Sequence, residues 1–303
     1  MAAPYRIYQK RRLGLELPEA EVEAVIERAL AEDISHGDVT SELLIPPQLQ
    51  GKASILVKAK GILAGGGVAK RVFLRVDPSL EVDVLIPDGR PVKAGDIVAS
   101  VSGRVISILR AERTALNFLQ RLSGIASTTA QYVARTKGFN AIITDTRKTT
   151  PGLRLLEKYA VCIGGGRSHR FHLGDGILIK DNHLAALRAL GMSLRDIVAK
   201  AKKNAPKGLK VEVEVNTLPE AVEAAEAGAD IIMLDNMSPG EMRRIVGLLG
   251  NKVKTEASGG VTLANVRRVA MSGVNTISVG ALTHSAEALD ISLEFEPGTL
   301  RLI

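Results

Sequence analysis

Two short apolar runs in the middle of the chain each end in side chains that could bind an anion. The runs are AIIT at 141–144 and ILI at 177–179, and the polar residues at or just beyond their ends include Thr146, Arg147, Lys148 and Lys180. His169 and Arg170 lie between the two runs. A buried strand followed at once by cationic residues is typical of an α/β barrel, where the carboxyl ends of the strands carry the ligand site. A solvated loop is the alternative, but such a loop needs no apolar strand before each basic cluster.

Acidic side chains occupy comparable places further along the chain. Glu214 lies near the end of the strand expected at 211–215, and Asp235 follows the strand expected at 230–234. Because side chains alternate along a strand, Glu212 and Glu214 face the same way. Carboxylate oxygens suit Mg²⁺, and they would also oppose the positive charge of an oxocarbenium-like transition state. A salt bridge to a barrel lysine is the other interpretation, and the sequence leaves both open.

Two glycine-containing turns follow the last two expected strands, at 253–257 and 275–279. Their residues are Ser258, Gly259 and Gly260 in the first turn and, directly after Val279, Gly280 and Ala281 in the second. We expect Thr262 to cap the helix after the first turn, and Thr283, His284 and Ser285 to open the helix after the second. Glycine lets the backbone approach a phosphate, and a helix N-terminus offers free N–H groups, so the pattern predicts a phosphosugar site. The glycines could instead only turn the chain.

The elements that must position these residues belong to an α/β protein of two parts. A smaller, β-rich α/β sandwich domain is expected at 1–118, joined by the C-terminal tail 288–303, and a barrel domain at 119–287. The barrel should contain six α/β units, TIM-like and either closed or incomplete, because a strand, a polar tip and a helix recur. Its expected strands are 141–145, 176–180, 211–215, 230–234, 253–257 and 275–279.

Within the first domain, the pattern predicts one early helix and then short strands. PEAEVEAVIERALAED at 18–33 reads as an amphipathic helix. Alternating runs between 51 and 108, the last of them VISIL, read as strands, and Gly65 to Gly67 as a tight turn beside a helix start. A long helix is expected from Arg110 to Lys137, with Gly124 as a close-packing point, and the alternating tail at 291–296 should rejoin the first sheet.

Composition narrows the class of partner. The 303 residues carry a formal net charge of +7, which is compatible with binding to nucleic acid, to a membrane surface or to an acidic small molecule. The cations are not interleaved with stacking aromatics, so an anionic substrate is favoured over nucleic acid. The start MAAPYRIYQKRR lacks an apolar secretory core, and no run reaches membrane-spanning length, so we expect no membrane association. The single cysteine, Cys162, fits a reducing compartment, and we expect a cytoplasmic location.

Several ordered blocks resemble one enzyme family, quinolinate phosphoribosyltransferase, the carboxylating nicotinate-nucleotide pyrophosphorylase. The blocks are ERTALNFLQRLSGIA (112–126), DTRKTTPGLR, KYAV, GGG followed by His-Arg, LIKDNH, EVEV (212–215), MLDN (233–236), EASGG (256–260) and VGALTHS (279–285). The resemblance covers nearly the whole chain from Leu30 onward. It implies transfer of a phosphoribosyl group to quinolinate in NAD biosynthesis, with release of pyrophosphate and CO₂.

The resemblance also implies roles for individual residues. It assigns catalysis to Lys148, Lys180, Glu214 and Asp235, and Mg²⁺ to the last two, largely through the substrate. The substrate-binding residues that it implies are Arg113, Thr146, Arg147, Lys148, His169, Arg170, Lys180, Glu214, Asp235, Ser258, Gly259, Gly260, Val279, Gly280, Ala281 and His284. It places Arg113 in the site of a neighbouring subunit, so we expect a homodimer, or a hexamer built from such dimers.

Two other functions are compatible with parts of the pattern. A Schiff-base aldolase would use Lys180 as a nucleophile, although several neighbouring cations suit a dianion better than a simple carbonyl. A basic nucleic-acid-binding protein would use the net positive charge without any turnover of a phosphosugar. Trapping of a substrate on Lys180 by borohydride would support the first, and retention on duplex DNA near physiological salt would support the second.

Overall fold

The computed structural model describes residues 17–303 of the chain. These residues form two compact units. The sandwich unit comprises 17–130, 149–165 and 282–303, and the barrel unit comprises 131–148 and 166–281. The segment MAAPYRIYQKRR and the first 16 residues of the predicted first domain lie outside the described residues.

The sandwich unit is built on one antiparallel sheet. Its strands are β1 (Leu49–Val57), β3 (Glu81–Val84), β5 (Ile97–Arg104), β12 (Ile291–Phe295) and β13 (Arg301–Leu302). The order is β12-β1-β5-β3, with β13 also paired to β1. The tail therefore rejoins the first sheet as predicted, with Ile291 opposite Val57. A separate ribbon pairs β2 (Gly61–Ile62) with β4 (Pro91–Val92).

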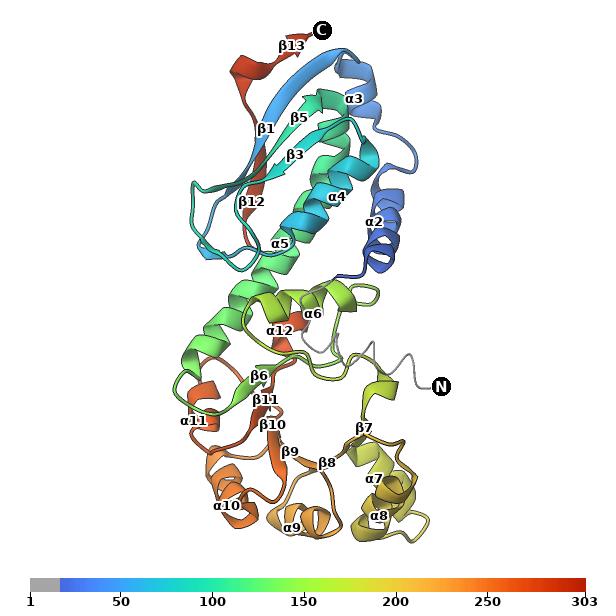
Figure 1. Ribbon diagram of the computed structural model, residues 1–303, viewed down its shortest axis with the longest axis vertical. Helices are drawn as coiled ribbons and strands as arrows, with labels where there is room; N and C mark the ends of the chain where they lie inside the picture. Colours follow the sequence, from blue (N-terminus) through green and yellow to red (C-terminus); the bar gives the residue numbers. More distant parts are fainter. Residues whose placement is uncertain (1–16) are drawn as a thin grey trace. The chain divides into compact units, whose positions relative to one another are not determined.

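Helices α4 (Gly66–Val76) and α5 (Val105–Arg135) lie against this sheet (Figure 1). The other helices of the unit are α2 (Glu19–Ile34), α3 (Val39–Leu44), α6 (Arg154–Ile163) and α12 (Ala281–His284). The early helix is confirmed: the apolar stripe of α2 is buried, with Ile26 at 0% exposure. The glycine turn before α4 is confirmed as well, because Gly65 is its N-cap with φ of 94° and its N–H donates to Asp88.

The run VISIL is not a strand, contrary to the prediction. It forms the first turn of α5, which begins at Val105 directly after β5. Val105, Ile108 and Ala111 are buried, and their spacing of three makes one helical stripe, so burial outweighs the β propensity of the branched side chains. The boundary placed between residues 118 and 119 falls inside α5, whose first part belongs to the sandwich unit and whose last turn belongs to the barrel unit.

Gly124 on α5 is a close-packing point, as predicted. A Cβ built there would lie 2.0 Å from the carbonyl oxygen of Glu287, and it would also meet Ala288. The hydrogen bond from the Leu289 N–H to the Gln120 carbonyl, at 3.0 Å, continues the same contact. The C-terminal segment therefore runs along α5 on its way to β12, and only glycine leaves it room.

The barrel unit contains six parallel strands. They are β6 (Ile142–Thr144), β7 (Ile177–Ile179), β8 (Val211–Val215), β9 (Ile231–Asp235), β10 (Lys254–Ser258) and β11 (Thr276–Ser278). The order is β6-β11-β10-β9-β8-β7, so the first strand of the barrel unit pairs with its last. Within residues 17–303, β6 and β7 are not paired, and the barrel is open between them. Arg167 bridges to Thr144 on the free edge of β6.

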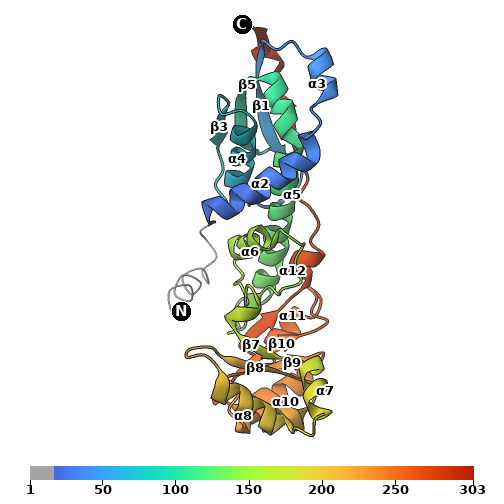
Figure 2. The ribbon, with the colours of Figure 1, turned by 90° about the vertical axis from the view of Figure 1, so that its right-hand side faces the viewer.

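Helices surround the strands of this unit (Figures 1 and 2). They are α7 (Asp181–Arg188), α8 (Leu194–Asn204), α9 (Leu218–Glu226), α10 (Pro239–Leu249) and α11 (Val266–Ala270). Gly228, Gly250 and Gly273 follow α9, α10 and α11 with positive φ, so each of these helices runs into a glycine turn. No helix in the described part of the chain has the length and apolar character needed to cross a bilayer.

Candidate active site

The carboxyl end of β6 carries the first cationic group. Asp145 is fully buried, and its carboxylate accepts the N–H of His169 at 2.9 Å. The Thr146 hydroxyl accepts the Lys148 N–H at 3.0 Å, which turns the chain just after the strand. Arg147 is half-buried and Lys148 is exposed. The end of β6 therefore fixes the backbone at His169 and presents Lys148 to solvent.

His169 lies between two acids of the barrel strands. Its Nε2 is 3.5 Å from Glu212 Oε2 on β8 and 3.4 Å from Glu256 Oε1 on β10. Burial alone would lower the pKa of His169, but contacts with the two carboxylates outweigh it and raise the pKa to about 10. Burial and the neighbouring Glu256 raise the pKa of Glu212, with His169 opposing. We infer that His169 is an imidazolium at neutral pH, flanked by two acids.

The donor atoms of this cluster lie within 4.8 Å of one another, a spacing that could hold a metal ion. The distances of 3.4 and 3.5 Å from His169 Nε2 to the carboxylates match ion pairs with a charged ring. The ring supplies one cation for two acids, and Glu212 Oε1 and Glu256 Oε1 are buried without a hydrogen-bond partner in the described part of the chain.

Arg170 and Arg147 are two neighbouring cations in the barrel unit. Nη1 of Arg170 donates to the Gly176 carbonyl at 3.3 Å. Burial and the nearby Arg147 lower the pKa of Arg170, and Glu212 acts in the opposite direction. Two guanidinium groups that repel each other in a partly buried place favour an anion between or beside them.

Lys180 and Glu214 face each other across neighbouring strand ends. Lys180 Nζ is 3.6 Å from Glu214 Oε2, so the salt bridge weighed from the sequence does exist. The Lys180 side chain is 47% exposed, whereas that of Glu214 is 10% exposed. Burial raises the pKa of Glu214, Lys180 lowers it, and Asp235 and Asp181 raise it. Glu214 and Asp235 are therefore close enough to repel, and their hard oxygens fit a Mg²⁺ ion that would relieve the repulsion.

The turn after β10 requires its glycine. Gly259 has φ of 83°, and a Cβ there would lie 2.3 Å from Asn236 Oδ1 and 2.8 Å from the Asn236 backbone nitrogen. The Asn236 N–H donates to the Ser258 carbonyl at 2.9 Å, and Ser258 is in register with Asp235. This close approach brings the ends of β9 and β10 together. Gly260 also has positive φ, at 59°.

The helix after this turn starts later than predicted. Thr262 does not cap it; α11 begins at Val266, with Asn265 as the N-cap. The Thr262 N–H donates to Asn265 Oδ1 at 2.8 Å, and the Asn265 amide donates to the Gly260 carbonyl. The Asn265 side chain therefore closes a turn over residues 260–265 and delays the helix.

The turn after β11 also differs from the prediction. Ala281 begins α12, and Thr283 and His284 end it instead of opening it, with Ser285 just beyond. The carbonyls of Thr283 and Ala286 accept hydrogen bonds from Arg121, so they are withdrawn from any continuing helix. Val279 is buried, and its N–H donates to the Thr144 carbonyl at 2.9 Å, while Gly280 is half-buried.

Known proteins match the whole arrangement. The pattern of the quinolinate phosphoribosyl transferase N-terminal domain matches residues 38–123, and that of its C-terminal domain matches residues 125–294. A probable nicotinate-nucleotide pyrophosphorylase (carboxylating) of Bacillus subtilis (strain 168) is 42% identical over 274 residues, which cover 90% of this chain and 93% of the relative. The chain belongs to the quinolinate phosphoribosyltransferase family.

Other members extend this similarity to plants and to solved structures. The chloroplastic nicotinate-nucleotide pyrophosphorylase (carboxylating) of Arabidopsis thaliana is 43% identical over 295 residues, covering 92% of this chain and 84% of the relative. The crystal structure of NadC from Streptococcus pyogenes has a TM-score of 0.87 and 41% identity, over 95% of this chain and 99% of that one. The nicotinate-nucleotide pyrophosphorylase of Francisella tularensis has a TM-score of 0.88 and 38% identity, over 93% and 99%.

The structure distributes the residues suggested by the family resemblance over both units. Arg113 and His284 belong to the sandwich unit, and both are exposed. The others belong to the barrel unit and lie at or just beyond strand ends or in the segment 167–170. The latter residues are Thr146, Arg147, Lys148, His169, Arg170, Lys180, Glu214, Asp235, Ser258, Gly259, Gly260, Val279, Gly280 and Ala281.

Sequence reasoning missed Glu256. Its carboxylate is 3% exposed and completes the His169 cluster together with Glu212. The alternation that paired Glu212 with Glu214 would also have placed Glu256 on the same face of β10 as Ser258. The single cysteine, Cys162, is half-buried on α6.

Proposed function

We propose that the protein transfers the phosphoribosyl group of phosphoribosyl pyrophosphate to quinolinate and forms nicotinate mononucleotide, pyrophosphate and CO₂. The observation that carries the proposal is the placement of Arg147 and Arg170 in the same unit as the close set of Lys180, Glu214 and Asp235. This arrangement offers cations to a diacid and acids to a cationic sugar carbon, within a family whose members bear this activity in their names.

Binding of the two substrates follows from the chemistry of these side chains. A guanidinium matches a planar carboxylate with two parallel hydrogen bonds, which suits Arg147 and Arg170 to the carboxylates of quinolinate. Lysine acts as a point charge, which suits Lys148 and Lys180 to the pyrophosphate or to a carboxylate. The glycine turns after β10 and β11 expose backbone to the 5-phosphate.

The reaction then proceeds in two steps. The lone pair of the pyridine nitrogen forms a bond to C1 of the ribose while the bond from C1 to the pyrophosphate oxygen breaks, and Glu214 and Asp235 stabilise the positive charge that develops on the sugar. The pyridinium then accepts the electron pair of the bond to the adjacent carboxylate, which leaves as CO₂, and a proton takes its place on the ring carbon. Cations near the pyridine ring favour the binding of negatively charged pyridine acids in the site.

We further propose that Glu214 and Asp235 hold Mg²⁺ together with the substrate. When bound, Mg²⁺ would neutralise charge on the departing pyrophosphate. The fit rests on two observations: the carboxylates repel each other, and Glu214 is one-tenth exposed beside a single lysine. Removal of divalent ions by a chelator should abolish turnover, and added Mg²⁺ should restore it.

We also propose a homodimer, with Arg113 serving the site of the partner subunit. Arg113 is exposed on α5. It is not one of the two barrel arginines, Arg147 and Arg170, that repel each other. Mixing Arg113→Ala subunits with Lys180→Ala subunits should restore part of the activity, because one hybrid site would keep both residues. Mixtures no more active than either variant alone would contradict shared sites. On the basis of its single thiol, we place the protein in a reducing compartment, the cytoplasm.

One assay tests the reaction. Quinolinate and phosphoribosyl pyrophosphate should yield nicotinate mononucleotide, pyrophosphate and CO₂ in equal amounts, with nicotinate and a larger pyridine acid as competitors. Release of pyrophosphate without CO₂ would exclude the decarboxylating reaction. A matched control is Lys202→Ala, because Lys202 forms an exposed pair with Asp230 and should leave the rate unchanged.

A further inference from the structure

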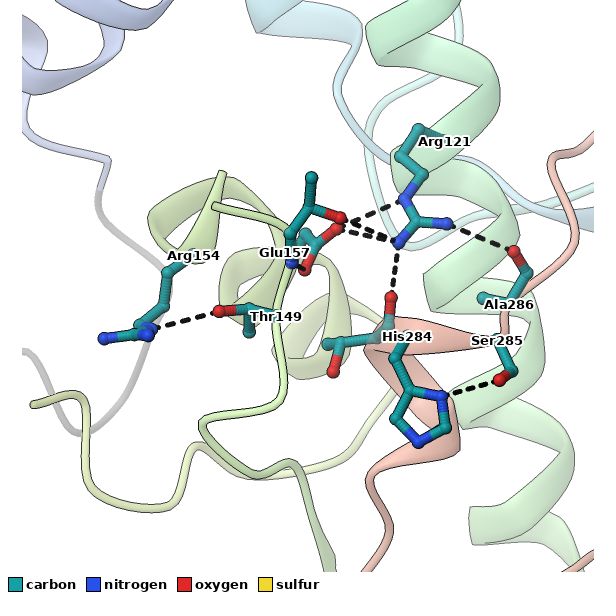
Figure 3. A network of polar contacts seen from close by, with 9 residues as sticks. Arg121, Thr149, Arg154, Glu157, His284, Ser285 and Ala286 are labelled. Atoms are coloured by element: carbon teal, nitrogen blue, oxygen red, sulfur yellow. Dashed lines mark hydrogen bonds and ion pairs between the residues drawn. The ribbon is translucent and has the colours of Figure 1, made fainter. Parts of the chain in front are cut away.

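Arg121 on α5 uses all three of its guanidinium nitrogens. Nε and Nη2 donate to Glu157 Oε1, at 3.2 and 2.8 Å. Nη1 donates to the Ala286 carbonyl at 3.2 Å, and Nη2 also donates to the Thr283 carbonyl. Figure 3 shows the guanidinium between Glu157 on one side and the segment from His284 to Ala286 on the other. One planar group therefore joins α5 to two other segments.

Glu157 on α6 is a fully buried carboxylate with both oxygens occupied. Oε1 accepts from Arg121, and Oε2 accepts the Thr150 N–H at 3.0 Å. The exposure of its side chain is 0%, compared with 28% for Arg121. A buried carboxylate is tolerated only when it is paired and hydrogen-bonded, and Glu157 meets both conditions. The geometry leaves no room for a donor in place of either oxygen.

The two segments held by this pair carry residues of the candidate site. Thr150 lies two residues after Lys148 in the chain, and Thr283 directly precedes His284. The contacts reach backbone groups: the Thr150 N–H and the carbonyls of Thr283 and Ala286. Backbone contacts fix where a segment runs, whatever side chains it bears. The pair therefore sets the course of both segments.

We propose that Arg121 and Glu157 are positioning residues for the phosphoribosyl transfer, holding the segments that carry Lys148 and His284 in place. This inference rests on the proposed function, because it concerns the binding of the same substrates. Lys148 on the first segment is suited to the pyrophosphate, and the second segment follows the turn at Gly280, which is proposed to bind the 5-phosphate. Loosening of the pair should therefore weaken binding of phosphoribosyl pyrophosphate in particular.

Two conservative variants separate positioning from simple stabilisation. Arg121→Lys keeps the positive charge beside Glu157 but replaces the planar fork by one ammonium, which cannot reach Glu157, Thr283 and Ala286 together. Glu157→Gln keeps the shape but presents an amide donor either to Arg121 or to the Thr150 N–H. Arg75→Lys is the matched control, because Arg75 forms an exposed pair with Glu27 on the helices of the same unit.

The test measures kcat and KM for both substrates, the thermal midpoint and hydrogen exchange in the segments 146–153 and 282–288. We expect Arg121→Lys to lower kcat/KM for phosphoribosyl pyrophosphate by about a hundredfold, because a displacement near 1 Å can have that effect. Most of the change should appear as a higher KM, and both segments should exchange faster. Glu157→Gln should show the same pattern, and Arg75→Lys should match the wild type.

Three outcomes would overturn the inference. Kinetic constants of Arg121→Lys within about twofold of wild type would remove any positioning role. A lower kcat with unchanged KM, in proportion to the loss of folded protein, would show that the pair only stabilises the fold. A wild-type protein that forms no nicotinate mononucleotide would refute the proposed function itself, a result distinct from an active wild type whose activity survives Arg121→Lys.

Discussion

Replacement of His169 by glutamine would leave two buried carboxylates facing each other without the imidazolium between them. Glu212 and Glu256 each approach the imidazole within 3.5 Å, and their side chains are 7% and 3% exposed. In the native protein the positive ring lies between them. Glutamine has nearly the length to fill the space but supplies no charge, so the variant isolates the electrostatic contribution of the imidazolium.

The size of the effect follows from the separation of the groups. The imidazolium lies 3.4 and 3.5 Å from the two carboxylates, and at that distance it attracts one unit negative charge by about 5 kcal/mol at an effective dielectric constant near 20. The variant loses this attraction, but it can remove the remaining repulsion between the carboxylates by binding a proton, which costs about 4 kcal/mol at pH 7 for a carboxyl whose ordinary pKa is about 4.3. We therefore expect the free energy of unfolding to fall by about 3 to 4 kcal/mol at pH 7.

The loss should depend on pH with a defined sign. In the variant, a buried carboxyl has a folded pKa above its unfolded value, so the folded state binds more protons than the unfolded state. Stability is then regained as the pH falls, by about 1.4 kcal/mol per unit, until the unfolded carboxyl is itself protonated near pH 4.3. The deficit relative to wild type should therefore shrink between pH 7 and pH 4.5.

Urea unfolding followed by far-UV circular dichroism measures these values, since the chain has no tryptophan to report fluorescence. Glu256→Gln should cost much less than His169→Gln, because it leaves one cation facing one acid. The double variant, His169→Gln with Glu256→Gln, should regain most of the stability that His169→Gln alone loses. His36→Gln, at an exposed position, is the control. A deficit for His169→Gln below about 1 kcal/mol, or one unchanged by pH, would refute the charged cluster.

Three further outcomes are expected. Because contacts with the two acids raise the pKa of His169 to about 10 from an ordinary 6.5, its stabilising contribution should be complete below pH 6.5 and should disappear as the pH rises through 10 in urea titrations. Gly124→Ala should lower the free energy of unfolding by about 1 to 3 kcal/mol, because the new methyl group would meet the Glu287 carbonyl, whereas Gly67→Ala, with nothing within 4 Å, should not. Lys180→Ala should reduce turnover by about a hundredfold or more with an unchanged circular dichroism spectrum, and a near-normal rate would remove Lys180 from the site.

Local patterns in the sequence were sufficient for most of the elements. Strands β6, β7 and β9 are short apolar runs bounded by polar residues, and β8 (VEVEV) alternates, so their positions follow from the chain itself. The direction of the polar tips follows too, because parallel strands joined by helices end at one edge. VISIL is the exception: its alternation suits a strand, and only packing of Val105 and Ile108 against the rest of the sandwich unit makes it helical.

The candidate site divides in the same way. The residue types near the strand ends could be predicted from the sequence, because Lys180 follows the run ILI, Asp235 ends IIMLD and Glu214 lies one residue before the end of VEVEV. The contacts that these side chains make with one another could not be predicted from the sequence. That Lys180 faces Glu214 at 3.6 Å depends on β7 lying beside β8, a pairing between segments some thirty residues apart.

The sequence by itself determined which segments of the barrel unit are strands, which of their ends are polar and to which family the motifs are similar, since these depend on neighbouring residues. Only the tertiary structure decided that β6 pairs with β11 and leaves the barrel open beside β7. It also placed the His169 ring between acids of two other strands and Arg121 between two distant segments. Such contacts join residues far apart in the chain, and their charge states arise from burial that no local pattern records.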